Sequence, residues 1–410
     1  MTDVIVVGAG AAGMMAAGTC AKRGKRTILF ERNEKPGRKL MITGKGRCNV
    51  TNNCDDMEEL INNVVKNGKF LYSSFSNFSP KDTISFFEEN GVRLKTERGK
   101  RVFPESDKAS DIVDCLKYFL KSNGVSLENH RVKEIIVENG KAVGIRTFDD
   151  LEYRAKNVII ATGGKSYPMT GSTGDGYEMA KKVGHTVTQL KPSLVPLEVC
   201  EGFCSEAMGL SLRNVELKVE DLKKKKIIFF EFGEMIFTHF GVSGPLVLSA
   251  SSHIRQMEKE RYVLHIDLKP ALTFEQLDKR LVREFTDNSN KNYINVLDHL
   301  LPKKLVPIIA KLSKIEFSQK ANQITKSQRE SLIKLLKDLK LTVKDFRPVE
   351  EAIITSGGIS VKEIEPKTMK SKIVDNLYFC GEILDVDAYT GGFNLQVAFS
   401  SGKTAGESVE

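Results

Sequence analysis

Val4-Ile5-Val6-Val7-Gly8-Ala9-Gly10-Ala11-Ala12-Gly13 is the stretch that decides the fold of this chain of 410 residues. Its four β-branched apolar residues predict a short buried strand, and residues 14–21 predict a helix directly after the glycines. In such a Gly-x-Gly-x-x-Gly turn the first glycine permits the tight turn and the second allows a pyrophosphate to approach the backbone. The third allows the helix to pack close to its strand, so that the helix N-terminus points at the anion.

The acidic residue Glu31 ends a second predicted strand, residues 26–30, and Arg32 follows it. An acid at this spacing typically binds the ribose 2′-hydroxyl of an adenosine. A solvated helix cap is the alternative interpretation of Glu31, and the spacing favours ribose binding. Because strand, glycines, helix, second strand and acid stand in this order, the sequence predicts a site for an ADP-containing dinucleotide.

The bulk composition is that of a globular chain with two or three domains, with 40% hydrophobic and 28% charged residues. The longest apolar stretch, residues 4–18, is interrupted by glycines and belongs to the dinucleotide turn. Lys22 and Arg23 follow this stretch instead of preceding it, unlike the basic residues of a secretory signal. We therefore expect a cytoplasmic protein that does not contact membranes.

The seven cysteines are irregularly spaced and form no Cys-x-x-Cys pair. This spacing argues against a disulfide framework and against a dithiol redox partner. Cys200 and Cys204 stand apart from other cysteines and histidines, so we expect no metal site.

The formal net charge is +9, and two groups of basic residues contribute to it. The run Lys223-Lys224-Lys225-Lys226 is interpreted as a solvated turn in preference to a nucleic-acid or acidic-membrane contact. The second group lies where a bound pyrophosphate would require positive charge, so the charge does not by itself predict a nucleic-acid partner. Its members are Lys35, Arg38, Lys39, Lys45 and Arg47.

The order of predicted elements indicates an α/β domain that is split by an insertion. Residues 194–268 alternate in short runs that predict antiparallel strands in a barrel or sandwich, and residues 273–340 have helical periodicity. The first strand completes its sheet only if a C-terminal strand, residues 377–380, returns to it. Outside the insertion we predict helices over 56–68, 80–91, 107–123 and 394–407 and strands over 126–127, 132–138, 142–147 and 156–161. The predicted domains are 1–190 with 346–410, a β-rich substrate domain over 191–272, and a helical subdomain over 273–345.

Further glycine clusters extend the predicted site beyond the first turn. The loop of residues 36–52 is too long for a minimal nicotinamide site and could enclose the middle of a longer cofactor. Ala161-Thr162-Gly163-Gly164 ends a strand, and Gly381-Glu382 follows another. Thr390-Gly391-Gly392-Phe393-Asn394 opens the last helix, whose unpaired amides would be directed at an electron-rich group.

Motifs along nearly the whole chain resemble those of the HI0933-like family of FAD-dependent oxidoreductases, which includes aminoacetone oxidases and bile-acid-related reductases. The family belongs to the flavoproteins with two dinucleotide-binding domains, of the glutathione-reductase type. Lys45 and Ala388 stand where the family more often has glycine. The matching segments are residues 44–52, Thr162-Gly163-Gly164-Lys165-Ser166-Tyr167-Pro168, 171–176, 237–245, Thr355-Ser356-Gly357-Gly358, 381–387 and 389–396.

The resemblance implies an α/β fold in which a Rossmann-like FAD-binding domain is interrupted by a β-barrel-like and helical insertion. It implies that Glu31 binds the ribose, that the Val132 backbone meets the adenine, and that the amides of Asn394 and Leu395 reach the flavin ring. The expected cofactor-binding residues are Gly8, Gly10, Ala11, Ala12, Gly13, Glu31, Arg32, Arg38, Lys39, Thr43, Gly44, Arg47, Cys48, Asn49, Val132, Ala161, Thr162, Gly163, Gly381, Glu382, Gly392, Phe393, Asn394 and Leu395.

No residue in the sequence is an evident catalytic acid or base, which is usual where a cofactor supplies the chemistry. Tyr167, His239 and Tyr389 are the candidates. Either tyrosine could be a core aromatic or line the substrate side of the flavin. For His239 we favour a buried histidine whose ring is hydrogen-bonded to backbone over a catalytic acid.

The expected function is hydride transfer between flavin N5 and a small organic substrate by a non-covalent FAD enzyme. NADH or NADPH would act as a transient co-substrate, because the sequence contains no second nicotinamide-binding unit. Two alternatives stay open: an oxygen-using amine oxidase of the aminoacetone type, and a non-catalytic flavoprotein associated with nucleic acid. The sequence indicates no oligomeric state.

Overall fold

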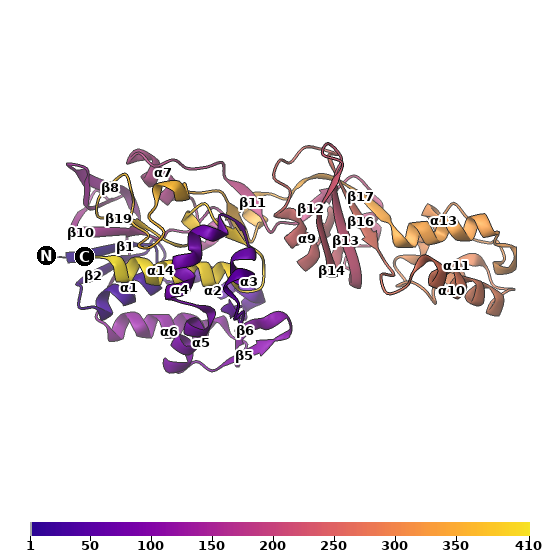
Figure 1. Cartoon of the computed structure of the whole chain (residues 1–410), viewed down its shortest axis with the longest axis horizontal. Coiled ribbons are helices and arrows are strands. Elements are labelled where there is room, and N and C mark those ends of the chain that lie inside the picture. The colour runs from indigo at the N-terminus through magenta and orange to yellow at the C-terminus, as the bar shows by residue number, and fades with distance from the viewer. Residues whose placement is uncertain (1) are drawn as a thin grey trace. The chain divides into compact units, whose positions relative to one another are not determined.

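The computed structural model describes residues 2–410 and divides into two compact units (Figure 1). The first unit is formed by Met1–Ser193 together with Pro348–Glu410, and the inserted unit by Leu194–Arg347. No helix within residues 2–410 has both the length and the apolar character needed to cross a bilayer.

A mixed sheet forms the centre of the first unit, and its parallel part has the strand order β7-β2-β1-β10. The C-terminal strand β19 pairs in parallel with β10, so the predicted return of the chain end to the first strand's sheet is confirmed. The antiparallel strands β9 and β8 extend the sheet from the first half of β10. The strands are β1 (Thr2–Val7), β2 (Thr27–Phe30), β7 (Ser126–Glu128), β8 (Val132–Glu138), β9 (Lys141–Thr147), β10 (Glu152–Ile160) and β19 (Leu377–Phe379).

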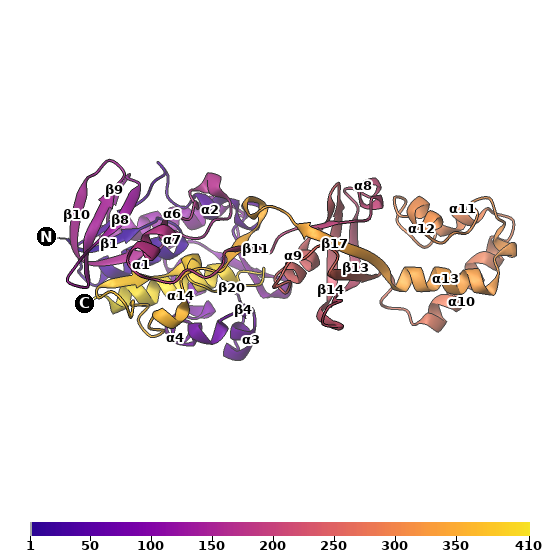
Figure 2. The same ribbon diagram turned by 90° about the horizontal axis from the view of Figure 1, so that it is seen from above.

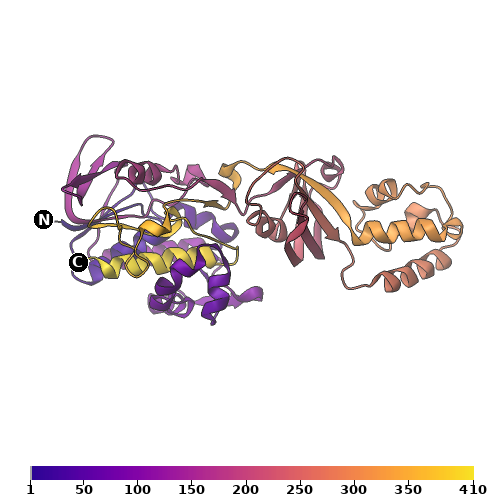
Figure 3. The ribbon, with the colours of Figure 1, turned by 45° about the horizontal axis from the view of Figure 1, so that its top comes forward.

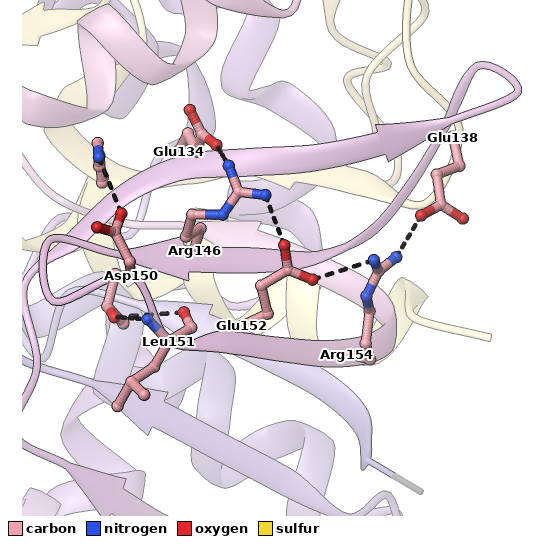
Figure 4. Close-up of polar contacts among 9 residues, drawn as sticks. Glu134, Glu138, Arg146, Asp150, Leu151, Glu152 and Arg154 are labelled. Carbon is pink, nitrogen blue, oxygen red and sulfur yellow. Dashed lines mark hydrogen bonds and ion pairs between the residues drawn. The ribbon is translucent and has the colours of Figure 1, made fainter.

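Cross-strand ion pairs cover one face of the β8–β9–β10 meander (Figure 4). Arg146 pairs with Glu134 and, at 2.5 Å, with Glu152. Arg154 pairs with Glu152 at 3.2 Å and with Glu138 at 2.5 Å. We call these five residues the charge ladder, because each arginine lies between two carboxylates: Arg146 on β9 between those of β8 and β10, and Arg154 on β10 between Glu138 of β8 and Glu152 of its own strand.

Two helices from opposite ends of the chain pack side by side in the first unit, α1 (Ala11–Lys22) in indigo and α14 (Phe393–Ser408) in yellow (Figures 1 and 2). Their close approach requires glycine, since a Cβ on Gly402 would lie 2.4 Å from the Ala12 carbonyl oxygen. A Cβ on Gly406 would lie 2.7 Å from the carbonyl oxygen of Ala16. The two chain ends are therefore joined by direct backbone packing.

The helices predicted over residues 80–91 and 107–123 are confirmed, the short helices over 38–42, 72–77 and 175–182 were not predicted, and the prediction over residues 56–68 is wrong in part. There the helix ends at Asn62, and the following β4 pairs with β20. Ser79 caps α5 as part of a capping box with Asp82. The elements are α2 (Arg38–Ile42), α3 (Met57–Asn62), α4 (Tyr72–Asn77), α5 (Pro80–Glu89), α6 (Ala109–Ser122), α7 (Asp175–Lys182), β3 (Thr51–Asn52), β4 (Val64–Lys66), β5 (Leu94–Glu97), β6 (Arg101–Pro104), β11 (Lys191–Ser193), β18 (Ile354–Ser356) and β20 (Asp387–Ala388).

The inserted unit contains a closed barrel of order β12-β15-β14-β13-β16-β17, which confirms the predicted β-rich character. The predicted helix up to residue 340 is wrong at its end, because Leu339 begins β17, which pairs with β16 and β12. Leu339, Leu341 and Val343 alternate inward along this strand. The strands are β12 (Leu197–Val199), β13 (Ser211–Asp221), β14 (Lys226–Thr238), β15 (Gly241–Ser243), β16 (Tyr262–Asp267) and β17 (Leu339–Phe346).

A helical part precedes β17 in the inserted unit (Figure 3). Thr273 and Thr325 begin its two longest helices with capping boxes. Its helices are α10 (Phe274–Asp287), α11 (Tyr293–Leu297), α12 (Val306–Leu312) and α13 (Lys326–Lys337), and α8 (Phe203–Glu206) and α9 (Pro245–Ser251) lie within the barrel sequence.

Candidate cofactor site

The first glycine turn has the geometry that a dinucleotide site requires. Gly8 has φ +101° and donates its N–H to the Phe30 carbonyl at 2.8 Å. A Cβ on Gly13 would lie 1.8 Å from the Gly8 carbonyl oxygen, whereas a Cβ on Gly10 would meet nothing within 4 Å. The outer glycines are thus required by packing, and the middle one faces open space where a pyrophosphate could approach.

The Glu31 carboxylate is buried beside this turn at the end of β2. One carboxylate oxygen accepts the Ala9 N–H at 2.9 Å. The other accepts the backbone N–H and the side-chain amide of Asn33 at 2.9 and 2.7 Å. The interpretation as a solvated helix cap is wrong, because the side chain is buried and the next helix begins only at Arg38.

Lys39, Glu382, Ser166 and Thr355 form a hydrogen-bonded group that we call the Lys39 network. The Lys39 ammonium donates to Glu382 and to Ser166, both at 2.7 Å. The second Glu382 oxygen accepts the backbone N–H of Thr355 at 2.9 Å. The Thr355 hydroxyl oxygen accepts the backbone N–H of Ser166 at 3.1 Å. The network therefore joins the loop after β2 to the C-terminal part of the chain.

Ser166 and Thr355 were missing from the predicted site residues. Both lie in glycine-containing segments that carried the family resemblance, residues 162–168 and 355–358. That shared feature was the only signal in the sequence that could have identified them, because their contact with Lys39 and Glu382 depends on the tertiary fold.

The C-terminal glycines also make close approaches to the first part of the chain. A Cβ on Gly381 would lie 2.7 Å from the Ala12 Cβ, and one on Gly392 would lie 2.2 Å from the Thr51 carbonyl carbon. The Asn394 side chain accepts the Ala388 N–H at 3.0 Å, so it fixes the loop before α14. Gly392 therefore places the N-terminus of α14, with the backbone amides of its first turn, against β3.

Two predicted site residues present buried polar atoms without a partner among residues 2–410, Asn49 through Oδ1 and Thr162 through Oγ1. Such atoms are unfavourable unless a ligand satisfies them. FAD offers hydroxyl and N–H groups for this purpose. Together with the open space at Gly10, these atoms show that the residues present fit FAD.

Three cations that were predicted to lie along the cofactor make contacts within the protein. Arg47 pairs with Glu97 and Asp107, both at 2.5 Å. Arg32 lies 3.3 Å from the Asp175 carboxylate. Arg38 donates to the Asn33 side-chain oxygen at 3.1 Å. Arg47 and Arg32 are thus held by protein carboxylates, whereas Arg38 is held by a neutral amide oxygen.

Other predicted cofactor residues are placed as follows. The Thr43 hydroxyl donates to the Leu40 carbonyl at 2.7 Å. Gly44 has φ +57° and Gly163 has φ +73°. Ala161 directly follows the last residue of β10. Cys48 is fully buried, and this burial raises the pKa of its thiol to about 12, so the thiol stays protonated near neutral pH. Ala11 and Ala12 open α1, Val132 opens β8, and Phe393 and Leu395 lie in the first turn of α14.

The catalytic candidates are divided between the two units. Tyr167 and Tyr389 are partly buried in the first unit, and burial raises the pKa of Tyr167. His239 belongs to the inserted unit, where it is exposed in the turn between β14 and β15, with its ring 4.9 Å from that of Phe240. The expectation of a buried His239 is wrong, because the strands reverse at this residue. Residues 2–410 contain no group of three or more side chains suited to hold a metal.

Comparison with known proteins identifies the family to which this chain belongs. The HI0933-like protein Rossmann domain family matches residues 2–408. The chain belongs to the HI0933-like family. It is accordingly an FAD-dependent oxidoreductase, as the predicted family and enzyme class stated.

Two curated relatives of this HI0933-like enzyme are equally similar to it. The 3-dehydro-bile acid delta(4,6)-reductase of Clostridium scindens is 31% identical over 100% of this chain and 99% of its own length. The ribosomal RNA dihydrouridine synthase of Haemophilus influenzae is 31% identical over 98% of this chain and 96% of its own length. The Escherichia coli protein of the same name is 29% identical over 97% of this chain and 96% of its own length.

Solved structures share the fold of the HI0933-like enzyme. A flavocytochrome c3 fumarate reductase in its open conformation has a TM-score of 0.54 at 17% identity, over 100% of this chain and 78% of that structure. The 3-ketosteroid-delta4-(5alpha)-dehydrogenase of Rhodococcus jostii RHA1 has a TM-score of 0.52 at 13% identity, over 98% of this chain and 96% of that structure.

Proposed function

We propose that this enzyme reduces a carbon–carbon double bond conjugated to a carbonyl group, with electrons from NADH or NADPH. The observation that carries the proposal is the chemistry shared by the two equally similar relatives. The first reduces double bonds of a 3-oxo steroid acid, and the second saturates the C5–C6 bond of uridine, which is conjugated to the C4 carbonyl. The substrates differ, but both names describe the reduction of a carbon–carbon double bond that is conjugated to a carbonyl group.

The residues of the first unit would hold the cofactor and protect it from solvent. FAD, when bound, supplies two-electron hydride exchange with the substrate carbon. Glu31 is oriented by the amides of Ala9 and Asn33 to accept a ribose hydroxyl. The first turn of α14 presents unpaired amides and the positive end of the helix dipole to an electron-rich group. The Lys39 network links the loop after β2 to the C-terminal part of the chain at the site.

Tyr167 and Tyr389 are the candidates for donating the proton that completes the reduction at the α carbon. A tyrosine hydroxyl is protonated near neutral pH, and burial raises the pKa of Tyr167 further. A general acid must be protonated at the working pH, and Tyr167 meets this requirement.

We propose transient docking of the nicotinamide in the substrate position. The glycine-rich residues 171–176 follow the turn Pro168–Thr170 and lead into α7, so they do not continue a strand as in a nicotinamide-binding βαβ unit. A single position used alternately by donor and acceptor predicts that each inhibits the binding of the other.

The test is an anaerobic titration of the purified holoenzyme with NADH and NADPH. The proposal expects loss of the yellow flavin absorbance, followed by its recovery when 2-cyclohexenone is added. Cyclohexene, in which the double bond lacks the carbonyl, is the matched control and should restore nothing. A flavin that stays oxidised with both nicotinamides, together with peroxide release from aminoacetone in air, would instead establish the amine-oxidase alternative.

A further inference from the structure

The positive charge of the chain is concentrated in one segment of the inserted unit. Residues 291–344 contain 12 lysines and arginines but only 4 aspartates and glutamates. This segment alone carries a net charge of +8, whereas the whole chain carries +9. It begins before α11 and ends within β17, so it includes three of the four helices of the helical part.

Four exposed lysines lie on one side of α12 and its flanking turns, and we call them the α12 basic face. They are Lys303, Lys304, Lys311 and Lys314. The opposite side of the helix is apolar and fully covered, with Leu305, Val306, Ile308 and Ile309 in the core of the inserted unit. At 1.5 Å per residue the four cations extend over about 15 Å.

The α12 basic face is not compensated by the protein. Within residues 2–410 none of these four ammonium groups makes an ion pair, and Lys304 donates only to the Met208 carbonyl at 2.7 Å. Four exposed like charges so close together repel one another and attract an external polyanion.

Each of the other two basic groups contains at least one cation with an acidic partner, whereas the α12 basic face contains none among residues 2–410. Arg47 in the cofactor loop pairs with Glu97 and Asp107. In the run of residues 223–226, Lys223 pairs with Glu258, and its backbone N–H bonds to the buried carboxylate of Asp221 at 3.1 Å. That run therefore acts as a hairpin turn, as predicted.

We propose that the α12 basic face is a docking surface for RNA, which it binds through backbone phosphates. This inference rests on the proposed function, in that it selects between the two substrate classes of the relatives, RNA and a steroid acid. A nucleic-acid duplex carries one charge per about 1.7 Å, so a face of about 15 Å can contact several phosphates at once. A single carboxylate on a steroid would not require four cations on one face.

The inference revises the expectation that nucleic acid is not a partner. That expectation depended on the basic residues around the cofactor loop, two of which, Lys39 and Arg47, pair with protein carboxylates in the fold. A membrane is less suited to the α12 basic face than RNA is, because most of the apolar side chains of α12 are buried in the core of the inserted unit, and Leu312 is its one large hydrophobic residue that is exposed. Interfacial helices bind membranes by inserting an apolar face.

The experiment measures binding of the full-length holoenzyme to a uridine-containing RNA hairpin over a range of salt concentrations. The test variant is K303Q/K304Q/K311Q/K314Q, and the matched control is K223Q/K224Q/K225Q/K226Q, which removes the same charge from an exposed turn. The test variant should bind at least about tenfold more weakly. In a plot of the logarithm of the binding constant against the logarithm of the salt concentration, the slope of the test variant should be less negative by about 3 to 4. This change is about one unit of slope for each phosphate that the variant no longer neutralises. The control should change affinity by less than about threefold.

Three results would overturn the inference. The test variant could bind as tightly as the unchanged protein, the control variant could bind as weakly as the test variant, or the unchanged protein could bind phosphatidylglycerol vesicles but not the hairpin. Reduction of 2-cyclohexenone by both variants, assayed in parallel, reports on the proposed function separately. If the test variant loses RNA binding but still reduces 2-cyclohexenone, both proposals are supported. If neither the unchanged protein nor the two variants reduce 2-cyclohexenone, but RNA binding still depends on the α12 lysines, only the proposed function is contradicted.

Discussion

The charge ladder of the first unit and the α12 basic face of the inserted unit use charged side chains in opposite ways. In the ladder, Arg146 and Arg154 each lie between two carboxylates of the β8–β9–β10 meander (Figure 4). On α12, four lysines share one exposed side without an acidic partner among residues 2–410. Charges that are compensated internally contribute to the fold, whereas uncompensated ones are available for an external partner.

We expect substitutions at buried or closely packed positions to affect cofactor binding or stability, and substitutions of exposed charges on α12 or in the charge ladder to leave both nearly unchanged. The same logic explains the cofactor loop. Its arginines suggested a pyrophosphate site in the sequence, but Arg47 is held by Glu97 and Asp107 in the fold.

The largest effect is expected at Gly392, where the N-terminus of α14 meets β3. Gly392→Ala would place a Cβ 2.2 Å from the Thr51 carbonyl carbon at a φ of +102°. The shift of α14 should weaken FAD binding by at least about tenfold, measured by fluorescence titration of the apoprotein. Gly124→Ala is the control, since Gly124 has φ +75° but open space around it, and it should cost only about 1 kcal/mol of stability. If both variants weakened FAD binding equally, the close approach of Gly392 to Thr51 would not be the cause of the effect.

A second large effect is expected at the buried ion pair of the barrel. The Arg261 guanidinium donates to both oxygens of Asp221, at 3.0 and 2.7 Å, and these bonds lower the pKa of Asp221 to about 2. Arg261→Met would leave a buried carboxylate without its cation, so the thermal midpoint of the inserted unit should fall sharply. Lys223→Gln, which removes an exposed pair with Glu258, should leave the midpoint nearly unchanged in the same differential scanning calorimetry experiment.

An intermediate effect is expected from pH, through His185 in the first unit. Its ring contacts Glu363 at 3.1 Å and Ser371 at 2.8 Å, and burial lowers its pKa below the ordinary value of 6.5. The unfolded state therefore binds a proton below pH 6.5 that the folded state does not, so this stabilisation is complete above pH 6.5 and is lost as the pH falls. Urea unfolding at pH 7.5, 6.5 and 5.5 should show a steeper loss for the unchanged protein than for His185→Gln, by at most about 1.4 kcal/mol per pH unit. Parallel pH profiles would refute this role of His185.

The smallest effect is expected in the charge ladder. Arg146→Gln removes two partly exposed ion pairs, which contribute little in water. The thermal midpoint should fall by no more than about 2 °C. A larger fall would mean that the ladder, and not only the buried packing of the meander, determines the stability of this sheet.

Local sequence patterns predicted much of the fold. The features that could not be predicted depend on contacts between segments that are distant in the sequence. The Gly8–Gly13 turn and the position of Glu31 follow from short-range order in the chain. The Lys39–Glu382 contact joins residues that are 343 positions apart, so no local pattern could reveal it. Leu339 was assigned to a helix because leucines at 332, 335, 336 and 339 fit helical spacing as well as the start of an alternating strand.

The predicted site residues show the same limit. The direction of Arg47 depends on acids at positions 97 and 107, which only the fold brings to it. The exposure of His239 depends on the tight reversal between β14 and β15, which the apolar residues around it did not indicate.

The most direct test of the account compares two cations that the sequence placed together at the cofactor. Lys39 joins the two chain ends through Glu382, whereas Arg47 pairs with surface acids. The measurement is the FAD-to-protein ratio of purified Lys39→Met and Arg47→Met after extensive dialysis. The account predicts that Lys39→Met loses FAD, with affinity reduced by at least about tenfold, while Arg47→Met stays yellow. A yellow Lys39→Met beside a colourless Arg47→Met would contradict it.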